Sequence, residues 1–349
     1  MMIFAMDLGS SKSAICTLDT GSGQVQHGSC PTQAAKIRTL LQRRRPDLVV
    51  VEVSPLAAMV HDVAVELGLA IQVADPTQDA WRWRNVKRKT DRDDALKLAR
   101  LAALGQINPV HIPEPRMRQW RELVEYRQSL VAERTRVKNR IRQVVLVHAE
   151  HRPRAGKYGW SQTARAALRE LARPLTECRA DELWRGLLAA ELDRLADLDG
   201  RLAVLEQQLD RLGRADARVA LVQTIPGCGG RVAEAVVTAL DRPERFANRR
   251  QVGAYAGLTP RRFQSGQMDR SGRTSKRGRP LLRQMLNQAA WQAIRRDTYF
   301  RALFLRVGRG VKGRRKIAIV AVMRQWFVVA WALLRDHQRY CPARLARAA

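Results

Sequence analysis

The chain has 349 residues, and its 63 lysines and arginines against 33 aspartates and glutamates leave a net charge of +30 at neutral pH. A surplus of this size predicts a polyanionic partner, most often nucleic acid, while 46% hydrophobic residues exclude wholesale disorder and suit two or three domains. The five cysteines are scattered without a CxxC or Cys/His cluster, which argues against a zinc site or disulfide framework and favours a reducing compartment.

Neither a signal peptide nor a membrane span is expected from the sequence. Asp7 interrupts the N-terminal apolar residues before a signal-peptide core could form. The longest apolar stretch, residues 317–334, is broken by Arg324 and Gln325. We therefore expect a protein of the bacterial cytoplasm, associated with the nucleoid and without a membrane partner.

The first part of the chain, residues 1–110, alternates strand-like and helix-like patterns. The run LVVVEV at 48–53 is continuous and β-branched, as expected of a strand buried on both faces of a sheet. Thr90 is a suitable N-cap for a helix that begins at Asp91. We predict an α/β fold with a mixed sheet and helices on its faces. The expected strands are 2–6, 12–18, 48–53 and 70–73, and the expected helices are 56–67 and 91–104.

The middle part, residues 111–213, has the apolar repeats of long helices. Apolar residues recur every seven positions from Leu123 to Val144, and leucines from Leu195 to Leu212 alternate spacings of three and four. This is the seam of a coiled coil or of a long antiparallel hairpin. The seam requires a partner, which is either a second chain or the other helix of the same chain, and the sequence favours neither.

The last part, residues 214–349, carries 29 basic and 7 acidic residues, a surplus of 22 charges. Its TIPGCGGRV segment resembles a helix-hairpin-helix turn, in which Gly227 and Gly229 would let backbone N–H groups approach a phosphate. A plain glycine-rich turn between helices explains the segment nearly as well. Residues 258–280 contain six arginines, one lysine and three glycines, which predicts a flexible basic loop facing phosphate.

Four carboxylates stand at positions typical of a metal site. Asp7 and Glu52 lie at the ends of expected strands, and Asp91 and Asp94 share one face at the start of an expected helix. Mg²⁺ is a hard ion that would stabilise such a set of oxygen ligands. The macrodipole of the helix alone would account for Asp91 and Asp94. It does not account for Asp7 and Glu52, and Asp93 should point elsewhere.

These acids belong to a pattern that resembles a ribonuclease-H-like, RuvC-type DEDD domain: Asp7-x-Gly in MDLGSSK, Glu52 after its strand, and KTDRDDALKLA. The C-terminal segments IPGCGG, RFANRRQVGAYAGLTPRRFQSG and SKRG before LLRQML are similar to the insertion-sequence-110 family of DEDD transposases, which is related to the pilin-gene inversion recombinase. The resemblance covers nearly the whole chain. One departure is that this chain reads Glu-Val-Ser-Pro where the family usually has Glu-Ala-x-Gly.

The resemblance implies three regions along the chain. Residues 1–110 would form a ribonuclease-H-like catalytic domain, and residues 111–213 a helical coiled coil that mediates oligomerisation. Residues 214–349 would form a basic, mostly helical transposase domain with the helix-hairpin-helix-like turn and the catalytic serine.

The activity that the resemblance implies is RNA-guided DNA recombination in the cytoplasm. The acids Asp7, Glu52, Asp91 and Asp94 would hold Mg²⁺, with Mn²⁺ as a substitute. A serine would attack DNA and form a phosphoserine link, and a structured bridge RNA would pair with donor and target DNA. The protein would act as a homo-oligomer, a dimer or tetramer, in which the serine of one subunit meets the acids of another.

Three serines compete for the role of nucleophile: Ser265, Ser271 and Ser275. Residue chemistry alone leaves them nearly equal, and the LTPRRFQSG motif places Ser265 on the serine of the family. Gly266 beside it permits close backbone approach to a phosphate. The residues expected to contact nucleic acid are Arg261, Arg262, Arg270, Arg273, Lys276, Arg277 and Arg279, together with Gly227 and Gly229.

Two other functions fit parts of the pattern. A RuvC-like, Mg²⁺-dependent structure-specific endonuclease would use the four acids and water without covalent serine chemistry. A scaffold that binds nucleic acid without catalysis would need only the basic surface. Replacing Ser265 separates the first from a recombinase, and replacing Asp7 separates the second.

Overall fold

A computed structural model of the chain describes residues 1–75, 90–148, 159–265 and 268–343, except for the side chains of Arg262, Phe263, Ser265 and Ser271. The chain divides into two compact units, Met1–Glu114 and Pro115–Ala349. Each is described by itself.

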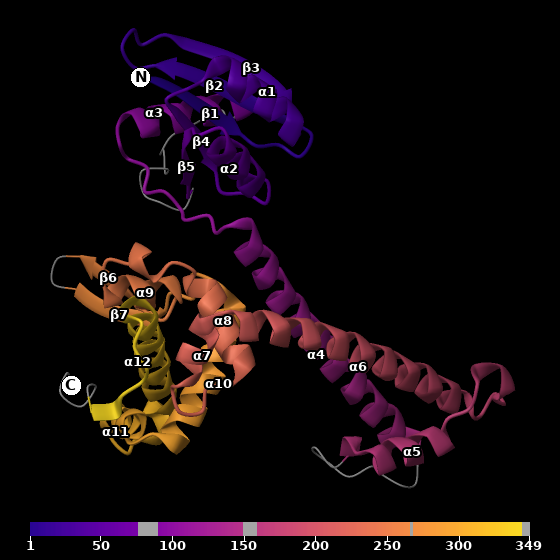
Figure 1. The fold of residues 1–349 in the computed structure, drawn as a ribbon. Coiled ribbons are helices and arrows are strands. Elements are labelled where there is room, and N and C mark those ends of the chain that lie inside the picture. The colour runs from indigo at the N-terminus through magenta and orange to yellow at the C-terminus, as the bar shows by residue number, and fades with distance from the viewer. Residues whose placement is uncertain (76–89, 149–158, 266–267, 344–349) are drawn as a thin grey trace. The chain divides into compact units, whose positions relative to one another are not determined.

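The first unit is built on a five-stranded mixed sheet with the order β3-β2-β1-β4-β5 (Figure 1). The first three strands form an antiparallel meander, and β4 and β5 run parallel to β1. This arrangement is consistent with the ribonuclease-H-like fold. The strands are β1 (Met2–Asp7), β2 (Lys12–Asp19), β3 (Val25–Pro31), β4 (Leu48–Glu52) and β5 (Ala70–Ala74).

Helices cover both faces of this sheet: α1 (Ala34–Arg44), α2 (Ala57–Glu66) and α3 (Asp91–Ala103). Alternate residues of the central strands point to opposite faces. Those on one face pack with α1 and α2 in one core cluster, and those on the other pack with α3 in a second. The predicted strands and helices of this unit are confirmed, whereas β3 and α1 were not predicted.

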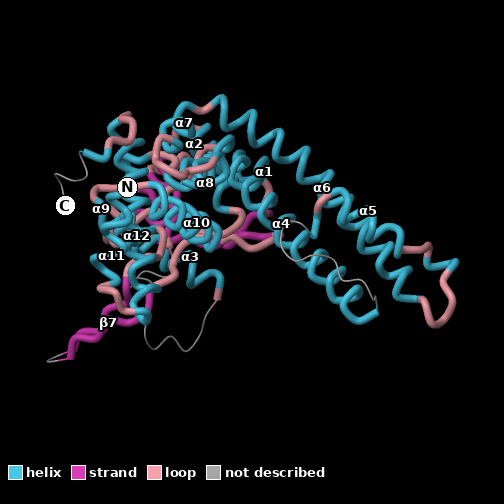
Figure 2. Tube along the Cα trace, turned by 90° about the horizontal axis from the view of Figure 1, so that it is seen from below, coloured by secondary structure: helices cyan, strands magenta, loops and turns pink. Residues whose placement is uncertain are grey.

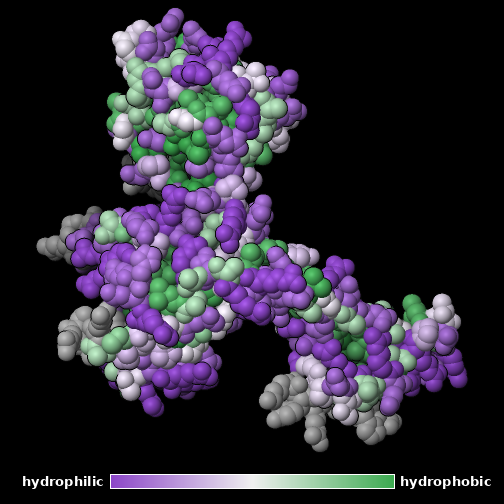
Figure 3. Space-filling view, in the orientation of Figure 1, coloured by the Kyte–Doolittle hydropathy of each residue, from purple (hydrophilic) through white to green (hydrophobic). Residues whose placement is uncertain are grey.

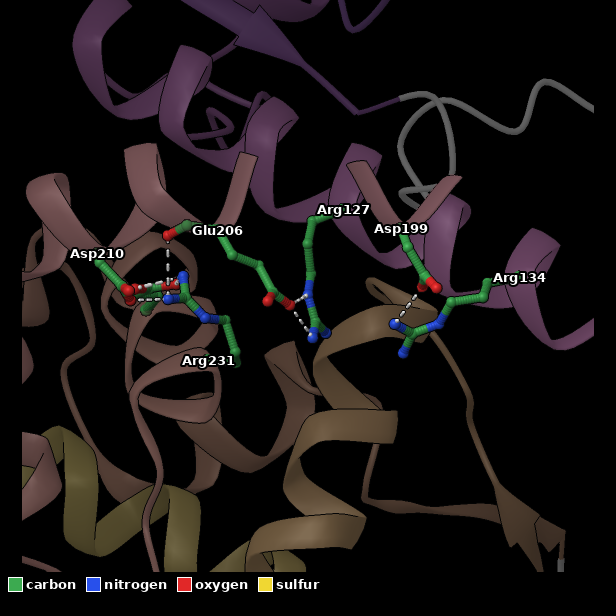
Figure 4. A network of polar contacts seen from close by, with 7 residues as sticks. Arg127, Arg134, Asp199, Glu206, Asp210 and Arg231 are labelled. Atoms are coloured by element: carbon green, nitrogen blue, oxygen red, sulfur yellow. Dashed lines mark hydrogen bonds and ion pairs between the residues drawn. The ribbon is translucent and has the colours of Figure 1, made fainter. Parts of the chain in front are cut away.

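The second unit contains two long helices, α4 (Pro115–His148) and α6 (Leu183–Ala215), with the short helix α5 (Gln162–Leu171) near one end of the pair. Ion pairs show that α4 and α6 are antiparallel, because residues later in α4 pair with residues earlier in α6. Arg140 pairs with Glu191 at 2.6 Å, and Arg127 with Glu206 at 2.6 Å. Figure 4 shows two of the ion pairs between these helices, Arg127 with Glu206 and Arg134 with Asp199.

The leucine seam of α6 is buried within the chain. Leu195, Leu198, Leu202 and Leu209 are at most 3% exposed and belong to the same core cluster as the apolar face of α4. The visible outer surface of the pair is mainly hydrophilic (Figure 3). The sequence left open whether the seam packs against a second chain or against the other helix of the same chain. In this fold it packs against α4 of the same chain.

The remaining helices form a body that shares a single core with the α4–α6 pair. They are α7 (Ala217–Gln223), α8 (Gly230–Leu240), α9 (Arg249–Tyr255), α10 (Pro280–Arg296), α11 (Thr298–Gly308) and α12 (Arg315–Asp336). Single helical turns within the described ranges include Leu175–Glu177, Pro243–Arg245 and Lys312–Arg314. The buried Arg121 of α4 donates to the carbonyls of Thr238 and Ala239 at the end of α8. This shared core explains why residues 115–213 and 214–349 form one unit.

One segment of the described chain, Lys312–Asp336, is long and apolar enough to cross a membrane, and 61% of its apolar window is buried. Trp326 and Phe327 of α12 are fully buried, and the indole nitrogen of Trp331 donates to the carbonyl of Pro243 at 2.8 Å. The apolar composition of α12 is that of a core helix.

The expected flexible loop at 258–280 contains a two-stranded antiparallel ribbon, so the prediction of a loop was wrong. Its strands are β6 (Pro260–Ser265) and β7 (Met268–Thr274), and the ribbon projects from the helical body (Figure 2). Backbone pairing forms such a ribbon without a buried face, so the sequence lacks the alternation of apolar residues that marks most strands.

Candidate active site

Asp7 and Glu52 end two neighbouring parallel strands. β1 and β4 pair from Ile3↔Leu48 to Met6↔Val51, so each acid follows one residue later on its own strand. Parallel strands end at the same edge of a sheet, which is where open α/β sheets bind their ligands. The sheet therefore brings the two carboxylates to one edge.

Of the three aspartates at the start of α3, Asp93 takes part in the helix cap, whereas Asp91 and Asp94 line the pocket. The Thr90 hydroxyl accepts from the backbone N–H of Asp93 at 3.2 Å and donates to the Asp93 carboxylate at 2.6 Å. This is a reciprocal cap at the first turn of the helix. Asp91 and Asp94, three residues apart, lie on the other face of that turn.

One pocket of about 420 Å³ is lined by all four predicted acids, Asp7, Glu52, Asp91 and Asp94. Asp7, Glu52 and Asp94 are each also engaged by another group of the chain. Within the described ranges, no three acidic, histidine or cysteine side chains gather closely enough to make a finished metal shell.

The pocket also contains a residue that the sequence analysis missed. Ser54 lines it, and the Ser54 hydroxyl is buried with no hydrogen-bond partner among the described residues. The departure from the family pattern after Glu52 was the signal that could have drawn attention to Ser54. A hard divalent cation fits this donor set, because it prefers carboxylate and hydroxyl oxygens.

Gly9 closes the turn between β1 and β2 next to the pocket. A Cβ atom at Gly9 would lie 2.4 Å from the carbonyl oxygen of Lys12, which is backbone and cannot swing away. Only glycine therefore permits this turn beside Asp7.

The three candidate serines occupy different places on the β6–β7 ribbon. Ser265 ends β6 opposite Met268, next to the turn, whereas Ser271 lies within β7 opposite Arg262. Ser275 follows β7, and its N–H donates to the carbonyl of Thr259 at 2.8 Å. Ser265 is thus the one nearest the tip of the ribbon.

Most of the predicted phosphate-contacting residues whose side chains are described are exposed on or next to this ribbon: Arg261, Arg270, Arg273, Lys276 and Arg277. Arg279 differs, because it forms an ion pair with Glu125 of α4 at 2.7 Å. The side chain of Arg262 lies outside the description. The ribbon therefore presents a dense positive surface, and Arg279 also ties its base to α4.

The glycine turn lies between α7 and α8. Gly227 has φ +82°, a conformation that favours glycine, and Gly229 is the N-cap of α8. Burial raises the pKa of the Cys228 thiol between them to about 12. Cys228 is therefore protonated at neutral pH and unsuited to act as a nucleophile.

Comparison with known families accounts for both units. The family model "Transposase IS116/IS110/IS902 family" matches residues 219–305, and the model of DEDD transposases of the IS110 type matches residues 4–149. The chain belongs to the IS110 family of transposases.

Individual relatives agree with the family models. The transposase is 29% identical over 366 residues to the transposase homologue y4rJ of Sinorhizobium fredii, with 94% of this chain and 90% of that one covered. It is 26% identical to the transposase for insertion sequence element IS1111A of Coxiella burnetii, with 72% and 68% covered. Among solved structures, RuvC of Thermus thermophilus matches at 16% identity with a TM-score of 0.24, over 32% of this chain and all of the other.

Membership of this family makes the transposase a DNA-processing enzyme, and its DEDD domain indicates dependence on a divalent metal ion. The acid pocket belongs to the first unit, and the basic ribbon with Ser265 belongs to the second.

Proposed function

We propose that this transposase is an RNA-guided DNA recombinase of an insertion sequence, in which four acids and Ser265 together break and rejoin DNA strands. The observation that carries the proposal is the single pocket lined by Asp7, Glu52, Asp91 and Asp94, which come from three separate elements. Structural needs do not explain such a gathering of carboxylates, because like charges at one place destabilise a fold.

The chemistry assigned to Ser265 is a reversible ester exchange. Its hydroxyl oxygen forms a bond to the DNA phosphorus, the bond from phosphorus to one deoxyribose oxygen breaks, and the serine proton ends on the released hydroxyl. Attack by the hydroxyl of another strand reverses these steps and restores the serine. Mg²⁺, or Mn²⁺ in its place, would stabilise the negative charge that develops on the phosphate. The acids would hold the ion, and arginines of the ribbon would orient the phosphate.

The partners in this proposal are donor DNA, target DNA and a structured bridge RNA encoded by the element. The acids and Ser265 lie in different units of the chain, and the family resemblance suggests that they meet between subunits of a dimer or tetramer. Catalysis would then depend on assembly in the bacterial cytoplasm, on the DNA of the nucleoid.

Replacing the serine tests the proposal against the RuvC-like endonuclease. Ser265→Ala should lose strand transfer and covalent protein–DNA adducts by at least about 10³-fold, because the nucleophile is gone. Ser275→Ala is the matched control and should keep both. Both variants are assayed on the same supercoiled donor and target with the guide RNA. Cleavage that persists in Ser265→Ala would support the endonuclease, in which water is the nucleophile.

Binding should depend strongly on salt, because the last 136 residues carry a surplus of 22 positive charges. If the protein contacts about six to ten phosphates, its affinity for DNA should fall by roughly three to five orders of magnitude between about 50 and 200 mM salt. Fluorescence anisotropy over that range measures the slope. A flat profile would mean that the charge is a solvated surface only.

A further inference from the structure

A second basic surface lies away from the ribbon, in a groove between the start of α8 and one face of α10. The groove has a volume of about 890 Å³. Gln288, Trp291 and Arg295 line it from α10, with the spacing of a single helix face, and Arg315 closes it from the start of α12. We call it the α8–α10 groove.

Two arginines give the groove its charge. Arg295 and Arg315 are exposed, and neither has an ion-pair partner in the part of the chain that the structure describes. The guanidinium of Arg315 lies 5.1 Å from the centre of the Trp291 ring, which holds it at the groove. The surrounding segment 306–316 has six basic residues and no acidic one, so no nearby carboxylate in that segment offsets this charge.

Arg231, a third arginine of the groove, differs from Arg295 and Arg315 because it is ion-paired within the protein. It forms ion pairs with Asp210 of α6 (Figure 4) and with Glu234 of α8. Its charge is neutralised by protein groups, and it fixes α8 against α6. Arg295 and Arg315 serve no such purpose in the described structure.

The glycine turn forms the opposite wall and leaves it bare. A Cβ atom at Gly227 would lie 2.8 Å from Cβ of Gln292, so this glycine sets the turn directly against α10. A Cβ atom at Gly229 would meet nothing within 4 Å. Gly229 also contributes no side-chain cap to the N-terminus of α8. The backbone here is open to a ligand that accepts hydrogen bonds.

We propose that the α8–α10 groove binds the sugar-phosphate backbone of a nucleic-acid duplex, as a site separate from the β6–β7 ribbon. Trp291, which lines the groove, lies roughly 16 Å along α10 from Pro280, where the ribbon joins that helix. A duplex, rather than a splayed single strand, fits because the Trp291 ring is already engaged. Arg315 lies over it and Phe304 packs at 5.7 Å, so it offers little open surface for base stacking.

This inference rests on the proposed function for its choice of ligand, but its test measures binding only. The full-length double variant Arg295→Gln/Arg315→Gln is compared with Arg179→Gln/Arg201→Gln. The control loses the same charge from exposed arginines that already have acidic partners, Asp181 and Asp197. Without divalent metal, a labelled DNA duplex is titrated by fluorescence anisotropy at several salt concentrations.

The groove variant should bind the duplex at least about ten-fold more weakly than the control, and its salt slope should fall by about two, one for each lost phosphate contact. RNA duplex and single-stranded DNA form the other arms. Weakening with either duplex supports the site and identifies the source of the backbone. Equal affinity of the two variants for both duplexes, or weakening confined to the single strand, would overturn the proposal.

Gly229→Ala gives an independent check that does not alter charge. The new methyl group meets no protein atom, so the melting temperature should fall only by the small amount that alanine costs relative to glycine at an N-cap, whereas the methyl would stand where a phosphate approaches the backbone. Duplex affinity should therefore drop by several-fold, and unchanged affinity would count against the groove. Loss of DNA cleavage in acid-pocket variants is a separate readout, so failure of the groove and failure of the proposed chemistry are distinguishable.

Discussion

Replacing Asp7 with asparagine should reduce DNA cleavage and strand transfer by the transposase by at least about 10³-fold, with its affinity for DNA unchanged. Asparagine keeps the shape of the side chain and removes the charge that a divalent cation requires. Asp7 ends β1 at the edge of the sheet and lines the acid pocket of the first unit, whereas the surplus of positive charge is carried by residues 214–349, which belong to the second unit. Cleavage assays and anisotropy on the same protein preparation measure the two effects.

Asp93→Asn is the matched control for this prediction. Asp93 sits between two pocket acids, but its carboxylate accepts from Thr90 at the helix cap, and asparagine can still accept that bond. The control should keep its activity. If Asp7→Asn cleaves DNA as well as Asp93→Asn does, the acid pocket has no catalytic role and a binding scaffold becomes the better account.

Mixing two inactive variants should restore activity if the site forms between subunits. Asp7→Asn retains Ser265, and Ser265→Ala retains the four acids, so a mixed oligomer contains one intact serine and one intact acid pocket that can meet. Strand exchange in the mixture should rise from background to a substantial part of the wild-type rate, about a quarter to a half if random pairing leaves one working site. The measurement is strand transfer against mixing ratio.

The control for this mixing experiment is the double variant Asp7→Asn/Ser265→Ala. It supplies neither an intact acid pocket nor the serine, so mixing it with either single variant should restore no activity. Mixed oligomers must be shown to form on DNA and guide RNA, for example with two affinity tags. Formation of mixed oligomers without any recovery would favour a site completed within each chain.

The fold of the first unit was predictable where burial is complete. The run at 48–52 is buried on both faces and is unmistakably a strand, and Thr90 caps α3 as its sequence indicates. β3 and α1 were missed because their patterns are weak: α1 buries only Ile37 and Leu41, and much of β3 is exposed. Short elements at the edge of a sheet carry little periodic signal.

For the candidate site, residue type and strand ends were enough to select the four acids that line the pocket. Ser54 was not selected, although the departure from the family pattern after Glu52 marked its position, because the burial of its hydroxyl in the pocket depends on the fold. Of the α8–α10 groove, the sequence predicted only the glycine turn, Gly227 and Gly229, as a phosphate contact. The groove joins Gly229, Arg295 and Arg315, which are remote in the sequence, and tertiary packing alone brings them together.

Ser265 should become covalently joined to DNA in a reaction that needs the acid pocket. The most direct measurement is to denature a running reaction, digest protein and DNA, and identify the nucleotide-bearing peptide by mass spectrometry. We expect a phosphodiester on Ser265 that is absent from reactions with Asp7→Asn or without divalent metal. A nucleotide on Ser271 or Ser275, or efficient strand transfer with no protein-bound DNA at all, would contradict it.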